Sequence, residues 1–211
     1  MSQKPSSPIK FYGFPLSGHA HRVELFLSLL DLPFENIKVD LAKGEHRTPD
    51  FLALNALGQV PVIQDGDVTM ADSNAILVYL ATQYADESWL PRDPVGAAQV
   101  QRFLSIAAGE IAKGPGMARV AKLFRRPLDI TAAQDIAARL FAMLEQHLAS
   151  RPFLTDAGRT IADLACYTYI AHAPEGGISL DPYPNIRAWL ARVEALPGFV
   201  GMLRSPLPAA E

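Results

Sequence analysis

In the first 84 residues, the apolar positions change repeatedly between the spacing typical of a strand and that typical of a helix. Strands are predicted at residues 10–14, 37–41, 60–62 and 68–70. Helical spacing is found at residues 19–30, residues 51–57 form a short helix or turn, and a further helix at 73–83 has the inner face Ile76, Tyr79, Leu80 and Gln83. The predicted order is therefore strand, helix, strand, helix, strand, strand, helix.

From residue 96 onward, every apolar pattern is helical. Stripes at helical spacing occupy residues 100–111, 136–148, 164–170 and 186–193. The intervening segment has two prolines and three acidic residues, as is typical of a linker. We therefore expect an α/β domain at 9–84, a linker at 85–95 and an all-α helical bundle at 96–204. In the first domain, a mixed sheet with helices on both faces is the thioredoxin-like arrangement.

The composition is that of a globular protein without a strong charge. Of the 211 residues, 49% are hydrophobic and 19% charged, and the net charge is −3, so a nucleic-acid partner is not expected. Charges interrupt the apolar runs well short of a membrane span, and residues 1–8 lack the apolar core of a signal peptide. The single cysteine, Cys166, excludes an intramolecular disulfide and fits a reducing compartment. We expect a cytoplasmic protein with no membrane partner.

Residues 55–73 contain two features that are costly unless they serve a ligand. Pro61 lies inside a predicted strand, where it cannot donate to the hydrogen-bond ladder. A cis bond between Val60 and Pro61 would seat it, and would turn the backbone N–H and C=O of Val60 toward an extended, peptide-like ligand. Asp72 and Ser73 stand at a predicted helix N-terminus, where unpaired N–H groups favour an anion. The alternative is a solvated hairpin followed by an N-capping serine.

This stretch resembles the glutathione-binding half of the glutathione S-transferase family. The resemblance rests on the sequence G-Q-V-P followed by D-S-N-A-I, with a D-G-D turn between them. It implies that Val60 and Pro61, assisted by Gln59, present a strand edge to the cysteinyl backbone of glutathione. It also implies that Asp72 and Ser73 hold the γ-glutamyl end.

Ser17 follows the first predicted strand, and a helix begins one or two residues later. On its own, a serine in this place is a plain helix N-cap. In serine-type transferases such a serine donates to the glutathione sulfur, and the pattern Ser17-x-x-x-x-Arg22-Val23 is most similar to the phi class. The resemblance therefore makes Ser17 the expected partner of the thiolate, with His19 as the reserve candidate.

His46 and Arg47 lie in the polar loop after the second predicted strand. Without the resemblance, a solvated turn would be favoured. Phi-like relatives carry a His-Lys pair at these separations from the serine and from the Gln-Val-Pro motif, and that pair contacts the glycyl carboxylate. Arg47 keeps the charge and adds a fork that binds a carboxylate through two hydrogen bonds. The resemblance thus implies a contact from Arg47 and assigns His46 to the same end of glutathione.

Thr160 and Asp163 form a T-x-x-D capping box before an apolar helical run, and each cap is expected to contribute about 1 kcal/mol of stability. The same box precedes the buried helix of the second domain in the transferase family. The resemblance therefore extends over both domains, from residue 9 to residue 204.

Other basic residues and histidines are expected to have structural roles. Arg22 is predicted to form a salt bridge near Glu24 or at the domain interface. Around residues 113–126, where Gly and Pro interrupt the helix, five basic residues form either a solvated face or a surface that attracts an anionic acceptor. His19 and His21 lie on different faces of a helix, and no other Cys or His cluster exists, so no metal site is expected.

The resemblance implies a glutathione transferase that is a homodimer and uses no cofactor beyond glutathione as co-substrate. The thiolate would attack a small electrophilic, mainly hydrophobic substrate in a pocket lined by Leu16, His19 and the first long helix of the bundle. Two alternatives stay open: a glutathione-dependent peroxidase or disulfide-bond reductase, and a non-catalytic binding or assembly module. A reductase of the glutaredoxin kind would need a cysteine where this chain has Ser17.

Overall fold

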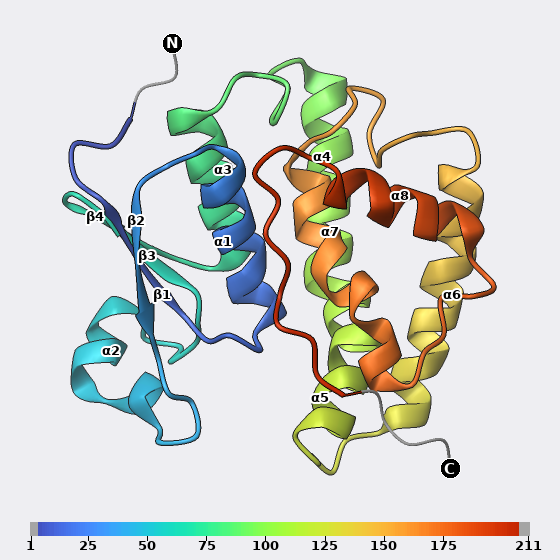
Figure 1. Ribbon diagram of the computed structural model, residues 1–211, viewed down its shortest axis with the longest axis horizontal. Coiled ribbons are helices and arrows are strands. Elements are labelled where there is room, and N and C mark those ends of the chain that lie inside the picture. Colours follow the sequence, from blue (N-terminus) through green and yellow to red (C-terminus); the bar gives the residue numbers. More distant parts are fainter. Residues whose placement is uncertain (1–3, 207–211) are drawn as a thin grey trace.

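The computed structural model describes residues 4–206 and shows a four-stranded sheet followed by a bundle of helices (Figure 1). The strands are β1 (Ile9–Gly13), β2 (Phe34–Lys38), β3 (Val62–Asp65) and β4 (Val68–Ala71). The helices around the sheet are α1 (Gly18–Leu29), η1 (Glu45–Arg47), α2 (Pro49–Leu54) and α3 (Ser73–Tyr84). Those of the bundle are α4 (Pro94–Ile106), η2 (Ala107–Gly116), α5 (Met117–Leu123), α6 (Ile130–Leu148), α7 (Ile161–Ala171), η3 (Ala173–Gly176) and α8 (Pro184–Glu194). The predicted thioredoxin-like domain and helical domain are both confirmed.

The strands lie in the order β2-β1-β3-β4, with β1 and β2 parallel and the other pairs antiparallel. Side chains alternate between the two faces of the sheet, as the strand period requires. Phe11 and Ile63 belong to the main core, which also contains the buried faces of α1 and α3. Tyr12 and Val62 belong to a smaller core with Phe51 of α2. Helices thus cover both faces of the sheet, as predicted.

Strand β2 lies earlier in the chain than the predicted residues 37–41. Val39 remains buried, but it belongs to the small core with Phe51 of α2. Asp40 turns the chain at this point, because its carboxylate accepts two backbone N–H groups from the loop that follows. The apolar alternation therefore continues beyond the end of the strand into this second core.

The third strand also differs from the prediction. It begins at Val62, after Pro61 and not before it, because proline has no N–H to offer the ladder. The Val60–Pro61 bond is cis, as predicted for a proline seated in this place. Gln59, Val60 and Pro61 therefore belong to the loop that leads into β3, at one end of the sheet.

Helix α3 buries a face that differs by one position from the prediction. Its buried apolar residues are Ile76, Leu77, Leu80, Ala81 and Tyr84. Gln83, predicted to face inward, is exposed. Tyr84 takes the inner position because its hydroxyl, together with that of Tyr79, donates to the carboxylate of Asp65 at the end of β3.

A continuous helical segment runs through α4, η2 and α5, although the sequence G-P-G was expected to interrupt it. The middle part, η2, is a π-helix that contains Pro115. A proline within an α-helix removes one i→i−4 hydrogen bond and clashes with the preceding turn. The wider π turn leaves more room for the ring, although Pro115 still has no N–H to donate, and such turns frequently occur at functional sites.

Helix α7 lies at the centre of the helical domain and contacts α1, α3, α4 and α8. The predicted capping box is present at its start, where the Thr160 N–H donates to Asp163 at 2.9 Å. The buried Asp163 carboxylate also accepts the Leu154 N–H at 3.0 Å and the Trp189 indole N–H at 2.9 Å. The box therefore holds a loop and α8 as well as capping α7.

The C-terminal segment passes between the two domains, beside α1 and α7 (Figure 1). The Val200 carbonyl accepts a hydrogen bond from His21 Nε2 at 2.9 Å, and the Ser205 N–H donates to Glu175 at 3.1 Å. The sequence predicts loose ends at residues 1–8 and 205–211, but Ser205 is anchored by this hydrogen bond. Residues 1–3 and 207–211 lie outside the described residues. None of the helices between residues 4 and 206 combines the length and apolar character that crossing a membrane demands.

Candidate active site

A pocket of about 640 Å³ lies where η1, the loop before β3 and the starts of α1 and α3 meet. Its lining includes all nine residues predicted for the site: Ser17, His19, His46, Arg47, Gln59, Val60, Pro61, Asp72 and Ser73. Leu41, Asn55, Leu57, Gly58 and Ala71 complete the lining. The fold thus brings together residues that are up to 56 positions apart, from Ser17 to Ser73. Of the residues predicted to line the acceptor side, only His19 lies in this pocket.

Ser17 is the N-cap of α1. Its backbone is extended, and its Oγ accepts the Ala20 N–H at 3.2 Å. Its own N–H donates to the Phe14 carbonyl at 2.9 Å, which closes the turn after β1. Because the cap uses the hydroxyl only as an acceptor, its hydrogen is available for a ligand, and within residues 4–206 it has no acceptor. The N-cap role and the predicted donor role are therefore compatible.

Asp72, and not Ser73, is the N-cap of α3. Its carboxylate Oδ1 accepts the N–H groups of Asn74 and Ala75, both at 2.9 Å. This leaves Oδ2 exposed, and it leaves the Ser73 N–H without a partner among the described residues. Asp72 has φ +72°, a conformation that costs a residue other than glycine about 1–3 kcal/mol. The carboxylate of Asp72 and the free N–H of Ser73 thus lie side by side at the start of α3.

The Ser73 hydroxyl lies between two side chains of α1. Arg22 Nη1 donates to it at 3.3 Å and to the Asn74 side-chain oxygen at 3.0 Å, while His19 Nδ1 lies 3.4 Å from it. Arg22 is fully buried, and its Nε and Nη2 atoms have no partner among the described residues. The predicted structural role of Arg22 holds, but its contacts are with the start of α3, and Glu24 instead accepts a hydrogen bond from Asn36.

His19 is a neutral imidazole in this site. Burial, with a smaller effect from the charge of Arg22, lowers its pKa to about 3. Its ring meets that of Tyr169 of α7 edge to face, with the centroids 5.1 Å apart. Tyr169 also lies against Gly18, where a Cβ atom would come within 2.7 Å of the phenol ring. Spacing arguments gave no signal for this tyrosine, because it is remote in the chain and occupies an ordinary helical position.

The loop before β3 presents backbone groups to the pocket. The N–H and C=O of Val60 have no backbone partner among residues 4–206. The Asn55 side chain donates to the Gln59 carbonyl at 2.8 Å, and this hydrogen bond holds the loop next to the end of α2. Gly58 has φ +60°, and a Cβ atom there would lie 2.8 Å from the His46 carbonyl oxygen. Glycine is therefore required at this position because of its positive φ and because the His46 carbonyl of η1 leaves no room for a Cβ atom.

Two residues of η1, His46 and Arg47, line the pocket. Arg47 is exposed, so its guanidinium is free to reach a ligand. His46 is half-buried, and its buried Nδ1 has no hydrogen-bond partner among the described residues. The lining thus combines the positive charge of Arg47 with the acid of Asp72, which suits a ligand that carries charges of both signs.

A larger hollow of about 990 Å³ lies elsewhere, beside the ends of α1 and α3. Its main charged group, Arg159, lies over the Trp89 ring at 4.8 Å. It has no helix N-terminus with unpaired N–H groups. The chemical groups that a peptide-like ligand needs are instead concentrated in the smaller pocket.

Both parts of the chain match models of known families. Residues 7–82 match the N-terminal domain of glutathione S-transferase, and residues 127–197 match its C-terminal domain. Glutathione S-transferase 3 of Zea mays is 34% identical over 218 residues, which cover 96% of this chain and 96% of the plant protein.

Solved structures give the same result. A glutathione S-transferase from Pseudomonas fluorescens is 33% identical, with a TM-score of 0.88 over 93% of this chain and 100% of its own. A glutathione transferase homolog from Drosophila mojavensis, solved with bound glutathione, is 27% identical, with a TM-score of 0.81 over 90% of this chain and 89% of its own. The chain therefore belongs to the glutathione S-transferase family and is a glutathione transferase, as its sequence predicts.

We predict that stability depends on pH through two buried histidines. Burial lowers the pKa of His19 to about 3 and that of His21 to about 4. Both are neutral in the folded state, so the stability they contribute is complete above the unfolded value of about 6.5 and is lost as the pH falls below it. The free energy of unfolding should decrease as the pH falls, with a slope that approaches about 1.4 kcal/mol per pH unit for each histidine well below pH 6.5, as measured by urea unfolding between pH 7 and 5.

The histidine resonances provide the check. In NMR titrations, the ring protons assigned to His19 through a His19→Gln variant should show no transition between pH 5 and 8. A midpoint near that of a free histidine would contradict the prediction. The variant should also have a shallower dependence of unfolding free energy on pH than the wild type.

Proposed function

We propose that the pocket binds glutathione in an extended conformation and ionises its thiol, with Ser17 as the hydrogen-bond donor to sulfur. The observation that carries the proposal is the Ser17 hydroxyl, which caps α1 as an acceptor and keeps its hydrogen for a ligand. The volume of about 640 Å³ is suitable for a tripeptide. The arrangement of Ser17, Arg22 and Val23 supports a serine-type, phi-like branch of the family.

The energy required for ionisation is within reach of this arrangement. A thiol with a pKa of about 8.5 is about 3% ionised at pH 7, and lowering the pKa by about two units requires about 2.7 kcal/mol. A hydrogen bond to a charged group contributes about 1.5–3 kcal/mol, and a helix N-terminus about 0.3–1 kcal/mol. Ser17 together with the start of α1 can therefore supply the necessary preference for the thiolate.

The start of α3 is suited to the γ-glutamyl end, which carries an amino group and a carboxylate. The exposed Oδ2 of Asp72 accepts from the ammonium, while the N–H and hydroxyl of Ser73 donate to the carboxylate. Arg22 lies beneath, fully buried, and forms no ion pair among the described residues. A carboxylate at Ser73 would therefore bring a negative charge close to an otherwise unbalanced positive one.

The other two parts of glutathione meet the loop and η1. The cysteinyl backbone pairs with the free N–H and C=O of Val60, as an added strand does, with Pro61 and Gln59 beside it. The glycyl carboxylate lies within reach of Arg47 and His46. The related structure from Drosophila mojavensis, solved with bound glutathione, supports glutathione as the ligand.

The thiolate then attacks an electrophilic carbon, forming an S–C bond as the leaving group departs with the bonding electron pair. The acceptor we propose is a small, mainly hydrophobic electrophile, and the family supports that choice. Glutathione is the co-substrate, and the proposal includes no other cofactor. The proposed setting is the cytoplasm, where glutathione is reduced.

We also propose a homodimer that involves both domains. A groove of about 510 Å³ lies between α3 and α4, and its apolar lining includes Met70, Val78, Leu104 and Ala108. It joins the edge strand β4 to the helical domain. A second copy that covers this groove would bury apolar surface from both domains at once.

Removing the Ser17 hydroxyl should raise the pKa of bound glutathione. In Ser17→Ala, we expect the thiolate absorbance near 240 nm to appear about one pH unit or more higher than in the wild type, and conjugation to slow about tenfold or more. Glutathione affinity should change less than about threefold, because the hydroxyl acts on the thiolate. Ser17→Asn, which keeps an N-cap without the hydroxyl, is the matched control for helix stability.

Unchanged thiolate titration in both Ser17 variants would contradict the assignment. His19→Gln then decides whether the reserve candidate has the role, because this variant would show the loss instead. A wild-type protein that binds glutathione without ionising it would overturn the proposed activation as a whole.

Removing the charge of Asp72 should weaken glutathione binding. Asp72→Asn retains the N-cap and tolerates positive φ, but it has no charge to attract the ammonium. We expect the dissociation constant, measured by calorimetry, to rise about tenfold, which corresponds to about 1.4 kcal/mol. Asp72→Ala should weaken it further because the cap is also lost. An unaltered affinity in Asp72→Asn would count against the γ-glutamyl site.

The dimer is tested by sedimentation. The wild type should sediment at about twice the chain mass of 22.9 kDa. Val78→Arg, which places a charge in the groove, should shift the population toward the monomer at micromolar concentration. A wild-type monomer at every concentration tested would rule out the homodimer.

A further inference from the structure

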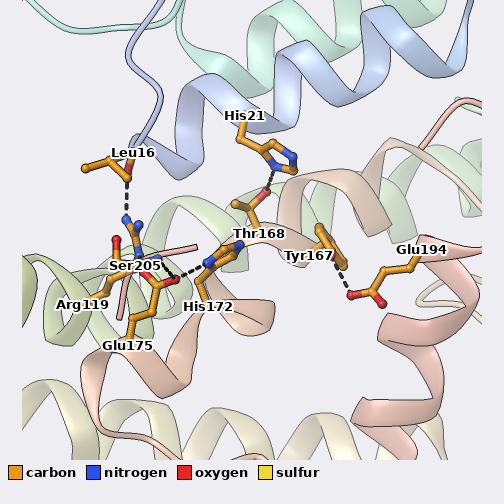
Figure 2. Close-up of polar contacts among 9 residues, drawn as sticks. All are labelled: Leu16, His21, Arg119, Tyr167, Thr168, His172, Glu175, Glu194 and Ser205. Carbon is orange, nitrogen blue, oxygen red and sulfur yellow. Dashed lines mark hydrogen bonds and ion pairs between the residues drawn. The ribbon is translucent and has the colours of Figure 1, made fainter. Parts of the chain in front are cut away.

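A buried ion pair connects α5 and η3 within the helical domain. Arg119 Nε donates to Glu175 Oε2 at 2.6 Å, and the two side chains are only 1% and 5% exposed (Figure 2). The sequence suggests that Arg119 belongs to a basic surface, and the structure contradicts this. Burying a charged pair is costly unless further hydrogen bonds satisfy its remaining atoms, so each contact of this pair matters.

The second oxygen of Glu175 holds two further groups. Oε1 accepts from His172 Nδ1 at 2.7 Å and from the Ser205 N–H at 3.1 Å (Figure 2). Burial opposes the ionisation of Glu175, but its hydrogen bonds and Arg119 together hold its pKa below the ordinary value. Burial lowers the pKa of His172, so this histidine is neutral and donates its Nδ1 proton. Glu175 is thus a fixed anion that orients Arg119.

The other end of Arg119 reaches the first domain. Its Nη1 donates to the Leu16 carbonyl at 2.8 Å (Figure 2). Leu16 immediately precedes Ser17. Within residues 4–206, this is the one hydrogen bond from the helical domain to the backbone of residues 14–17.

This contact restricts the backbone of Ser17, because the peptide group between Leu16 and Ser17 is planar. The Leu16 carbonyl and the Ser17 N–H belong to the same rigid plane. Arg119 holds the carbonyl, and the Phe14 carbonyl accepts the N–H at 2.9 Å. With both ends of the plane fixed, the position of the Ser17 Cα is fixed as well. The Ser17 carbonyl accepts the His21 N–H at 2.9 Å, which limits rotation about the N–Cα bond and so sets the direction of the side chain.

The next peptide is constrained from the same domain. The ring of Tyr169 lies so close to Gly18 that a Cβ atom there would be 2.7 Å from it. The helical domain therefore contacts the chain on both sides of Ser17, through Arg119 before it and through Tyr169 after it. The Ser17 side chain itself points into a pocket whose lining belongs wholly to the first domain.

We propose that Arg119 is a positioning residue that sets the Ser17 hydroxyl for its role at the glutathione sulfur, and that Glu175 and His172 hold Arg119 for this purpose. The proposal rests on the proposed role of Ser17. It assigns to the helical domain a part in activating glutathione, although no residue of that domain lines the glutathione pocket.

Arg119→Lys tests the bridge while keeping the charge that balances Glu175. An ammonium cannot reproduce the fork that reaches Glu175 through Nε and Leu16 through Nη1. We expect kcat for conjugation to fall about fivefold to tenfold and the pKa of bound glutathione to rise, while the dissociation constant of glutathione changes less than about twofold. Glu175→Gln, which keeps Arg119 in place with a weaker hold, should show the same effects to a smaller extent.

Tyr167→Phe is the matched control. It removes a hydrogen bond of 2.8 Å from Tyr167 to Glu194 within the helical domain, on the same helix as Tyr169 but away from Leu16 (Figure 2). We expect it to lower the melting temperature without changing kcat or the thiol pKa. If Arg119→Lys lowers only the melting temperature, as this control does, Arg119 is structural and the proposal is overturned.

A double-mutant cycle shows whether Arg119 acts through Ser17. In a Ser17→Ala background, Arg119→Lys should change kcat less than about twofold, because the group that it positions is absent. The same fold-loss in both backgrounds would overturn the proposal. Failure of the underlying function is distinguishable, since it would appear in the wild type as bound glutathione that is not ionised.

Discussion

Backbone groups that the sheet and the helices leave unpaired surround the pocket that we propose as the glutathione site. A buried or half-buried N–H or C=O needs a partner, and helix starts and strand ends are where partners are missing. Here β3 and β4 pair in antiparallel register, with Val62 opposite Ala71. That register places the residues before β3 beside those after β4, so the free backbone groups of Val60 and Ser73 lie at the same end of the sheet. The hairpin thus brings both sets of free backbone groups to the pocket, while α1 and η1 supply its other side chains.

Two buried arginines then fix the start of α1 relative to these free groups. Arg22 reaches from α1 to the start of α3, and Arg119 reaches from α5 to the carbonyl before Ser17. Both are at most 1% exposed, so neither exchanges its hydrogen bonds with water. A planar guanidinium with several donors at fixed angles is well suited to this purpose, because it connects two elements with a defined geometry. The position of the Ser17 hydroxyl therefore depends on hydrogen bonds from a charged group as well as on apolar packing.

The sequence, with its resemblance to the family, was sufficient to predict nine of the fourteen residues that line the pocket, because these nine stand at features with local signals. A proline in a strand, an Asp-Ser pair before a helical pattern and a serine after a strand can all be recognised within a few residues. The boundaries of β2 and the inner face of α3 were predicted less well, because Val39 and Tyr84 are buried by contacts outside their own elements. Periodicity reports that a residue is apolar, but it does not report which core receives it.

The burial of Arg119 could not be predicted from the sequence, for a physical reason. The basic residues nearest to it in the chain, such as Lys122 and Arg125, are half-buried or exposed, and the partner that makes its burial tolerable, Glu175, lies 56 residues later. A charge is expected in solvent unless its countercharge is known, and no local pattern reveals a countercharge at that separation. The contact from Arg119 to the Leu16 carbonyl also joins residues far apart in the chain, and this separation agrees with the positioning role that we propose. A residue that must connect the helical domain to the backbone before Ser17 cannot belong to the local motif around Ser17. The chemical group and the group that positions it are therefore encoded far apart in the chain.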